Sequence, residues 1–113
     1  MHEFTITKSI LSIVLQKAHE VKARQITKIE LLVGKLTGYV PECIRLQFDI
    51  LSRNTLAAGA DLVFHQPETK LYCRKCDHHF QSDSFDLVCP QCHTLKIDIL
   101  SGSELQVLSI DVE

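Results

Sequence analysis

Residues 71–92 read LYCRKCDHHFQSDSFDLVCPQC and contain four of the five cysteines of the chain. These cysteines form two Cys-x-x-Cys pairs, Cys73 with Cys76 and Cys89 with Cys92, and twelve residues separate the pairs. This is the spacing of a zinc ribbon, in which each pair supplies two corners of a tetrahedron of thiolates. The stretch therefore predicts a four-cysteine site for structural zinc.

The segment around these cysteines, residues 70–96, has few large apolar side chains and cannot bury enough surface to fold alone. We expect bound metal to contribute most of its folding energy and the metal-free segment to be disordered. His78 and His93 follow the two pairs closely. They are near enough to hydrogen-bond a thiolate, or to exchange with one as the pH falls. The ordinary alternative for each is a solvated histidine.

Hydrophobic periodicity outside this segment predicts two helices and three strands. The first helix should run from Thr7 to about Val21, with Thr7 or Ser9 as its cap, and the second from Pro41 to about Asn54. Strands are expected over residues 28–36, 60–66 and 104–112. The simplest closure is an α+β fold, with two helices on one face of a three-stranded sheet. Residues 1–69 and 97–113 form this domain, and residues 70–96 are an inserted zinc-ribbon-like knuckle before the last strand.

Composition limits the class of protein. The chain has 113 residues, 45% of them hydrophobic and 23% charged, which suits one ordinary globular domain. A net charge of −2 lacks the basic footprint of most nucleic-acid binders. The first residues show neither a basic leader nor a long apolar run, so we expect no export or membrane segment. Paired cysteines without an export signal indicate metal ligands in a reducing compartment, and cytoplasm is the expected location.

The chain begins Met1-His2-Glu3. A free α-amine, the amide nitrogen of residue 2 and the imidazole of that same residue can chelate one metal through fused rings, with the nitrogens in a plane. Nickel(II) and copper(II) favour such square-planar nitrogen sites. A histidine at position 2 is usually an accident, however, so the local chemistry alone does not decide the matter.

The combination of features is more specific. Met1-His2-Glu3, an amphipathic helix, a strand ending in Val33-Gly34, a second helix and the two cysteine pairs before a final strand occur in this order. Together they resemble the HypA/HybF family of hydrogenase nickel-incorporation proteins over essentially the whole chain. The resemblance implies that Met1, His2 and Glu3 bind nickel and that Cys73, Cys76, Cys89 and Cys92 bind structural zinc.

On the same basis, the nickel ligands would be the amine of Met1, the imidazole of His2 and the backbone amides of His2 and Glu3. The Glu3 carboxylate would tune the site from just outside. The resemblance implies a nickel metallochaperone and not an enzyme. It would deliver Ni(2+) to the large subunit of a nickel–iron hydrogenase during maturation, together with the GTPase HypB.

Two alternatives stay open. A zinc-ribbon interaction or nucleic-acid module would use Lys70, Arg74, Lys75 and Lys96 as a basic patch around the knuckle. An electron carrier would hold iron in the four cysteines, although Asp77 and His93 stand where such knuckles usually have glycine. Exposed sheet edges also permit a homodimer without requiring one.

Overall fold

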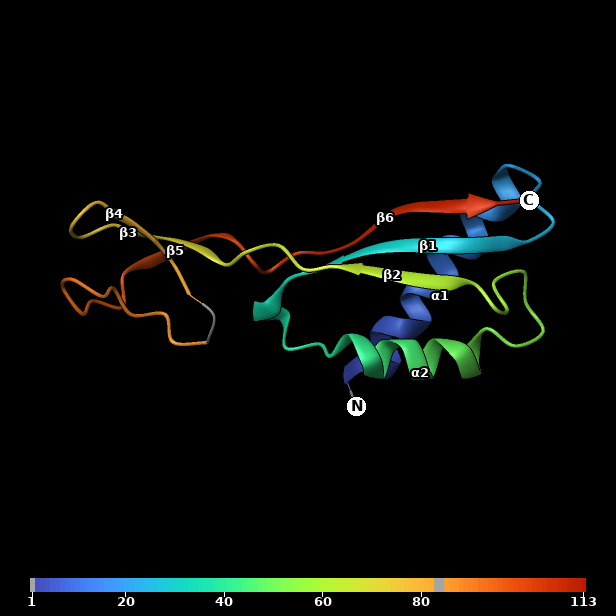
Figure 1. Ribbon diagram of the computed structural model, residues 1–113, viewed down its shortest axis with the longest axis horizontal. Helices are drawn as coiled ribbons and strands as arrows, with labels where there is room; N and C mark the ends of the chain where they lie inside the picture. Colours follow the sequence, from blue (N-terminus) through green and yellow to red (C-terminus); the bar gives the residue numbers. More distant parts are fainter. Residues whose placement is uncertain (1, 83–84) are drawn as a thin grey trace. The chain divides into compact units, whose positions relative to one another are not determined.

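The computed structural model describes residues 2–82 and 85–113, which form two compact units (Figure 1). The first unit comprises Met1–Leu31, Tyr39–Phe64 and Gln106–Glu113, and the second comprises Leu32–Gly38 and His65–Leu105. No helix within the described residues is long and apolar enough to cross a membrane.

The first unit contains two α-helices and the three-stranded sheet, which confirms the predicted fold class. The helices are α1 (His2–Glu20) and α2 (Pro41–Leu51), and the strands are β1 (Ile26–Val33), β2 (Asp61–His65) and β6 (Leu105–Val112). The strand order is β2-β1-β6, so β1 is central. Both helices lie on the same side of this sheet (Figure 1).

Helix α1 begins at His2, so the predicted start at Thr7 is wrong. Thr7 resembled a helix cap, but it is fully buried inside the helix, and its hydroxyl donates to the carbonyl oxygen of Glu3 one turn earlier. An acidic residue in the first turn, here Glu3, suits the positive end of the helix dipole. Of the predicted apolar stripe, Ile10, Val14 and Ala18 are buried, whereas Ile13 and Val21 are 48% and 63% exposed, so the buried face is narrower than predicted.

Helix α2 begins at Pro41, as predicted, and ends at Leu51, three residues before the predicted end at Asn54. Asn54 has a positive φ of 64°, which a right-handed helix cannot contain. The buried face of α2 is formed by Ile44 and Phe48, which are 0% and 2% exposed. These two side chains belong to the same core as the α1 stripe and the buried residues of β1.

The second unit contains a sheet that the sequence pattern did not predict. Its strands are β3 (Lys70–Cys73), β4 (His78–Gln81) and β5 (Ile97–Ser101), in the order β4-β3-β5, and both pairs are antiparallel. A single 3₁₀ turn, η1 (Lys35–Thr37), also belongs to this unit.

This unit extends beyond the expected knuckle of residues 70–96 at both ends. Residues 97–101 were assigned from sequence to the helical domain, but they form β5 and pair with β3. In this pairing Cys73 lies opposite Ile97, and Tyr72 lies opposite Asp98. Farther along, Gly34 approaches Gly102 so closely that a Cβ built on Gly34 would lie 2.0 Å from the Gly102 carbonyl oxygen. The short segment Leu32–Gly38 therefore packs against the part of the second unit that follows β5.

Candidate metal centre

The four cysteines come from two turns that the second sheet holds together. Cys73 is the last residue of β3, and Cys76 lies in the turn that leads into β4. Cys89 and Cys92 lie in the loop and turn that precede β5. Because β3 pairs with both β4 and β5, it brings the two turns to the same end of the unit.

The sulfur atoms form a compact cluster. Cys73 Sγ lies 3.5 Å from Cys92 Sγ, Cys76 Sγ lies 3.5 Å from Cys89 Sγ, and all four atoms lie within 4.8 Å of one another. All four side chains are free thiols. A tetrahedron of sulfurs around zinc, with bonds of about 2.3 Å, has edges of about 3.8 Å. The donor set and its dimensions therefore fit a tetrahedral thiolate-bound metal ion.

The two cysteine turns share one backbone geometry. The residue after each pair, Asp77 or His93, has a positive φ of 56° or 60°. Each donates its N–H to the carbonyl oxygen of the first cysteine of its pair, Asp77 to Cys73 at 3.0 Å and His93 to Cys89 at 2.9 Å. In the first turn, the N–H of Cys76 also lies 3.4 Å from Cys73 Sγ, which stabilises a thiolate there. The left-handed residues therefore close both turns around the sulfurs.

In the metal-free protein, the local environment shifts the pKa values of two of the cysteine thiols in opposite directions. Burial, aided by hydrogen bonds with the other cysteines, raises the pKa of Cys76 to about 12. For Cys89, burial is opposed and outweighed by hydrogen bonds from the backbone amides of Cys92 and Gln91, which lower its pKa to about 6. A metal ion needs thiolates as ligands, so metal binding has to displace the protons that remain.

Tyr72, which the sequence analysis did not select, supports the first turn. Its hydroxyl donates a 2.6 Å hydrogen bond to Asp77 Oδ1, and this bond raises the pKa of the Tyr72 phenol. Its ring also lies against His79, with 4.8 Å between the ring centroids. The Asp77 side chain is thus held from β3 while its backbone closes the turn. No sequence motif marks this pair, because its members are five residues apart across a turn.

The two candidate histidines lie next to the cluster in different ways. His78 begins β4 opposite Cys73, and its ring stacks on Phe80 with 5.9 Å between centroids. His93 occupies the left-handed position after Cys92. Among the described residues, the group of side chains able to share a metal ion consists of the four cysteines.

The basic patch of the alternative interaction module is partly neutralised. Arg74 Nε lies 3.2 Å from Asp98 Oδ1, so one of the four basic side chains of the patch already has an anionic partner.

The N-terminal candidates are only partly described. Met1 lies outside the described residues, and for His2 the structure gives only its place as the first residue of α1. The Glu3 carboxylate accepts a 3.3 Å hydrogen bond from the backbone N–H of Val40. Hydrogen bonds from its own backbone amide and from that of Val40 lower the pKa of Glu3.

The fold and the cluster define the class: a small α+β protein with a tetrathiolate metal centre on a separate sheet. The family model described as "Hydrogenase/urease nickel incorporation, metallochaperone, hypA" matches residues 1–112. The chain belongs to this family of hydrogenase maturation factors, and the predicted resemblance is confirmed. The family consists of nickel-incorporation metallochaperones and is not a family of enzymes.

Curated relatives agree with this assignment, and a solved structure shares the fold. The chain is 40% identical over 113 residues to a "Hydrogenase maturation factor HypA" of Dehalococcoides mccartyi, covering 100% of this chain and 95% of that protein. It is 34% identical to the protein of that name in Caldanaerobacter subterraneus, with both chains covered completely. The solution structure of the Ni metallochaperone HypA from Helicobacter pylori has the same fold, with a TM-score of 0.67, 22% identity and coverage of 97% and 96% of the two chains.

Proposed function

We propose that this chain binds nickel(II) at its N-terminus and delivers it to the large subunit of a nickel–iron hydrogenase during maturation. The observation that carries the proposal is the family match over residues 1–112, which includes Met1-His2-Glu3. Because the family is one of nickel incorporation, nickel is the cargo of the protein and not a resident cofactor.

The proposed nickel ligands are the amine of Met1, the imidazole of His2, and the backbone amide nitrogens of His2 and Glu3. The start of α1 at His2 supports this set, because the first N–H groups of a helix have no acceptor within the helix. Ligation by these amides costs no helical hydrogen bond. The Glu3 carboxylate already accepts from Val40, which supports a role beside the metal and not as a ligand.

We further propose that the ion in the four-cysteine cluster is structural Zn(2+), held by Cys73, Cys76, Cys89 and Cys92. Zinc has no geometric preference from d electrons and accepts four thiolates in a tetrahedron. His78, opposite Cys73, and His93, directly after Cys92, are proposed to lie beside this site. The second unit, which contains the predicted knuckle of residues 70–96, then folds with its metal, and all the proposed nickel ligands lie in the first unit.

A nickel site at a chain terminus suits transfer to a partner. Its ligands can be removed one at a time without unfolding the domain. The proposed recipient is the hydrogenase large subunit in the cytoplasm, and the GTPase HypB is proposed to work with this chain in the delivery. Protonation of the amine or of His2 removes donors, so nickel affinity falls as the pH drops. Copper should bind more tightly than nickel by the divalent stability order, so the partner must supply selectivity.

The test is a nickel titration by calorimetry at neutral pH, with tag-free, zinc-loaded protein. The wild type is compared with His2→Ala and with a variant that carries one extra residue before Met1. We expect about one nickel per wild-type chain, and loss of binding in both variants with zinc retained. If all three proteins bind nickel alike, or none does, the N-terminal site is refuted.

A further inference from the structure

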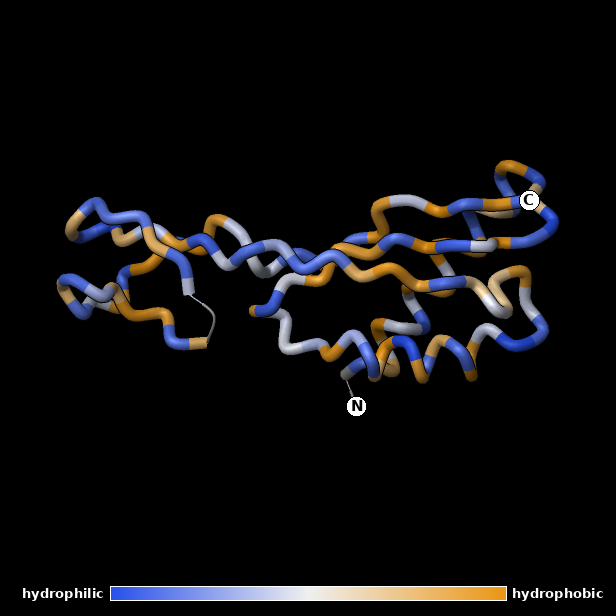
Figure 2. The backbone as a smooth tube through the Cα atoms, in the orientation of Figure 1, coloured by the Kyte–Doolittle hydropathy of each residue, from blue (hydrophilic) through white to orange (hydrophobic). Residues whose placement is uncertain are grey.

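Thr7 is a polar residue in an apolar position of α1. It lies three residues before Ile10 and seven before Val14, on the buried face of the helix, and it is 0% exposed. Along both helices of this unit, hydrophobic and hydrophilic residues follow one another (Figure 2), and this spacing would place another apolar side chain at position 7. A buried hydroxyl costs free energy unless it is hydrogen-bonded, and valine has nearly the same shape without that cost. The threonine therefore calls for a reason other than packing.

The hydrogen bond of Thr7 acts on the first turn of α1. Its hydroxyl donates to the carbonyl oxygen of Glu3, one turn earlier in a helix that begins at His2. The first four N–H groups of a helix have no acceptor inside it, so a terminal turn has few bonds of its own and frays readily. Because Thr7 is buried, water cannot compete for this hydrogen bond. The bond therefore ties the first turn to the buried part of the helix.

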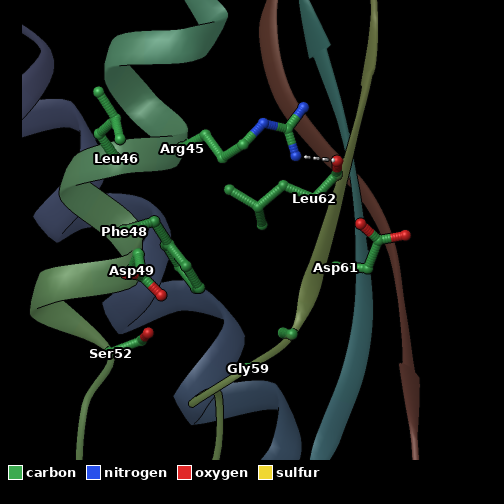
Figure 3. A pocket seen from close by; sticks show the side chains of 9 residues that line it. Arg45, Leu46, Phe48, Asp49, Ser52, Gly59, Asp61 and Leu62 are labelled. Carbon is green, nitrogen blue, oxygen red and sulfur yellow. Dashed lines mark hydrogen bonds between the residues drawn. The ribbon is translucent and has the colours of Figure 1, made fainter.

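Glu3 is held a second time, through its side chain. Its carboxylate accepts the 3.3 Å hydrogen bond from the backbone N–H of Val40, directly before α2. That helix is itself fixed, because Phe48 packs in the core and Arg45 Nη1 donates at 2.9 Å to the carbonyl oxygen of Leu62 in β2. Figure 3 shows Arg45 reaching from α2 to this strand. The carbonyl and carboxylate groups of Glu3 are therefore anchored to two different helices of the first unit.

We propose that Thr7 is a positioning residue for the nickel site at the N-terminus. This inference rests on the proposed nickel function, in which the amide nitrogens of His2 and Glu3 are ligands. Holding both the carbonyl and the carboxylate group of Glu3 restricts the backbone conformation of this residue, and with it the direction of its amide nitrogen. A ligand that is already ordered loses less conformational entropy when the metal binds. Thr7 therefore raises the nickel affinity from four residues beyond the nearest proposed ligand.

Ser9 supplies a matched control in the same helix. Its hydroxyl makes the same kind of hydrogen bond, to the carbonyl oxygen of Thr5 at 3.3 Å, but this bond is exposed. Water replaces an exposed hydrogen bond at little net cost. Thr5, moreover, is not a proposed nickel ligand. The two hydroxyls thus share their chemistry, whereas only that of Thr7 acts on a residue of the nickel site.

The test is a nickel titration by calorimetry of tag-free, zinc-loaded protein. Thr7→Val removes the hydroxyl and keeps the shape, and it should weaken nickel binding about fivefold, which corresponds to the net contribution of one hydrogen bond. Thr7→Ser keeps the hydroxyl and should bind nickel nearly as tightly as the wild type. Ser9→Ala should leave the affinity unchanged. Ile29→Val removes a buried methyl group from β1, destabilises the same unit to a similar extent, and should also keep the wild-type nickel affinity.

The outcomes separate this inference from the proposed function. If the wild type binds no nickel, or if His2→Ala in the same series binds it equally well, the N-terminal site itself is refuted and the inference falls with it. If His2→Ala loses nickel but Thr7→Val binds as tightly as the wild type, only the positioning role is refuted. Weakening by Thr7→Ser or by Ile29→Val to the same extent as by Thr7→Val would also refute it, because the effect would then come from packing or from global stability.

A measurement without nickel tests the holding of the first turn directly. Hydrogen exchange of the backbone amides of residues 6–8, followed by NMR, should be about fivefold faster in Thr7→Val than in the wild type, because the first turn opens more often. Ser9→Ala should not change the exchange of these amides. Equal exchange rates in Thr7→Val and the wild type would overturn the proposal.

Discussion

Replacing Gly34 by alanine should destabilise the cysteine-bearing unit through a backbone clash. The added Cβ would lie 2.0 Å from the carbonyl oxygen and 2.3 Å from the carbonyl carbon of Gly102, whereas ordinary contacts begin near 3.4 Å. The two segments would have to separate by about 1.4 Å. They are held by 2.8 Å hydrogen bonds from Gly34 to Glu104 and from Leu36 to Gly102. Overpacking against backbone and the strain on these bonds should together cost about 3 kcal/mol.

Gly38→Ala is the matched control, because it isolates the conformational term. Gly38 belongs to the same unit and has a φ of +76°, with nothing within 4 Å of an added Cβ. The Gly38→Ala variant should lose only about 1 kcal/mol of its free energy of unfolding, which is the cost of holding an alanine in the left-handed conformation. Gly34 has an ordinary φ of −69°, so its loss is steric alone. Urea unfolding of zinc-loaded protein measures both variants, and the reasoning fails if Gly34→Ala is no less stable than Gly38→Ala.

Three further outcomes follow from the sites. Chelating the metal should unfold β3, β4 and β5, while the first unit keeps its helices. Adding cobalt(II) should restore the fold and give the absorption spectrum of a tetrahedral thiolate site. A sheet that stays protected from hydrogen exchange without metal would contradict this prediction. Tyr72→Phe should lower the free energy of unfolding at neutral pH, but not at a pH above the raised pKa of the Tyr72 phenol. The reason is that the hydrogen bond to Asp77 stabilises the fold below pH 10 and is lost as the pH rises through that pKa. In an NMR titration the Glu3 carboxyl should show a pKa below its usual 4.5, and the Val40 amide should shift with it as the bond is lost on acidification; an unshifted Val40 signal would refute the contact.

The first unit could be predicted from sequence because its stability comes from burial. Apolar side chains at helical spacing in α1 and at alternating positions in β1 face a common core, and periodicity reports that directly. The start of α1 was missed because Thr7 has the chemistry of a cap, and only its burial shows that it is interior. The first turn carries no apolar stripe to reveal it, since Phe4 is 47% exposed.

The second unit could be predicted only through its cysteines. Strands β3, β4 and β5 have four or five residues each, too short to carry a periodic signal. Their order depends on ligands far apart in the chain and on pairing with β3. The left-handed conformations of Asp77 and His93 could not be predicted from a glycine at either position. Aspartate and histidine do, however, adopt a positive φ more readily than most residues.

The two units therefore depend on different physical terms, and this separates the tests of the two metals. The first unit has a core of buried side chains such as Val14, Ile29 and Phe48, and it contains every proposed nickel ligand. The second has few large buried side chains, Leu71 among them, and should depend on its thiolates. Those thiolates are also soft donors that nickel can occupy when zinc is absent. A nickel titration of zinc-free protein would therefore report on the cysteines, and only a zinc-loaded comparison with His2→Ala isolates the terminus.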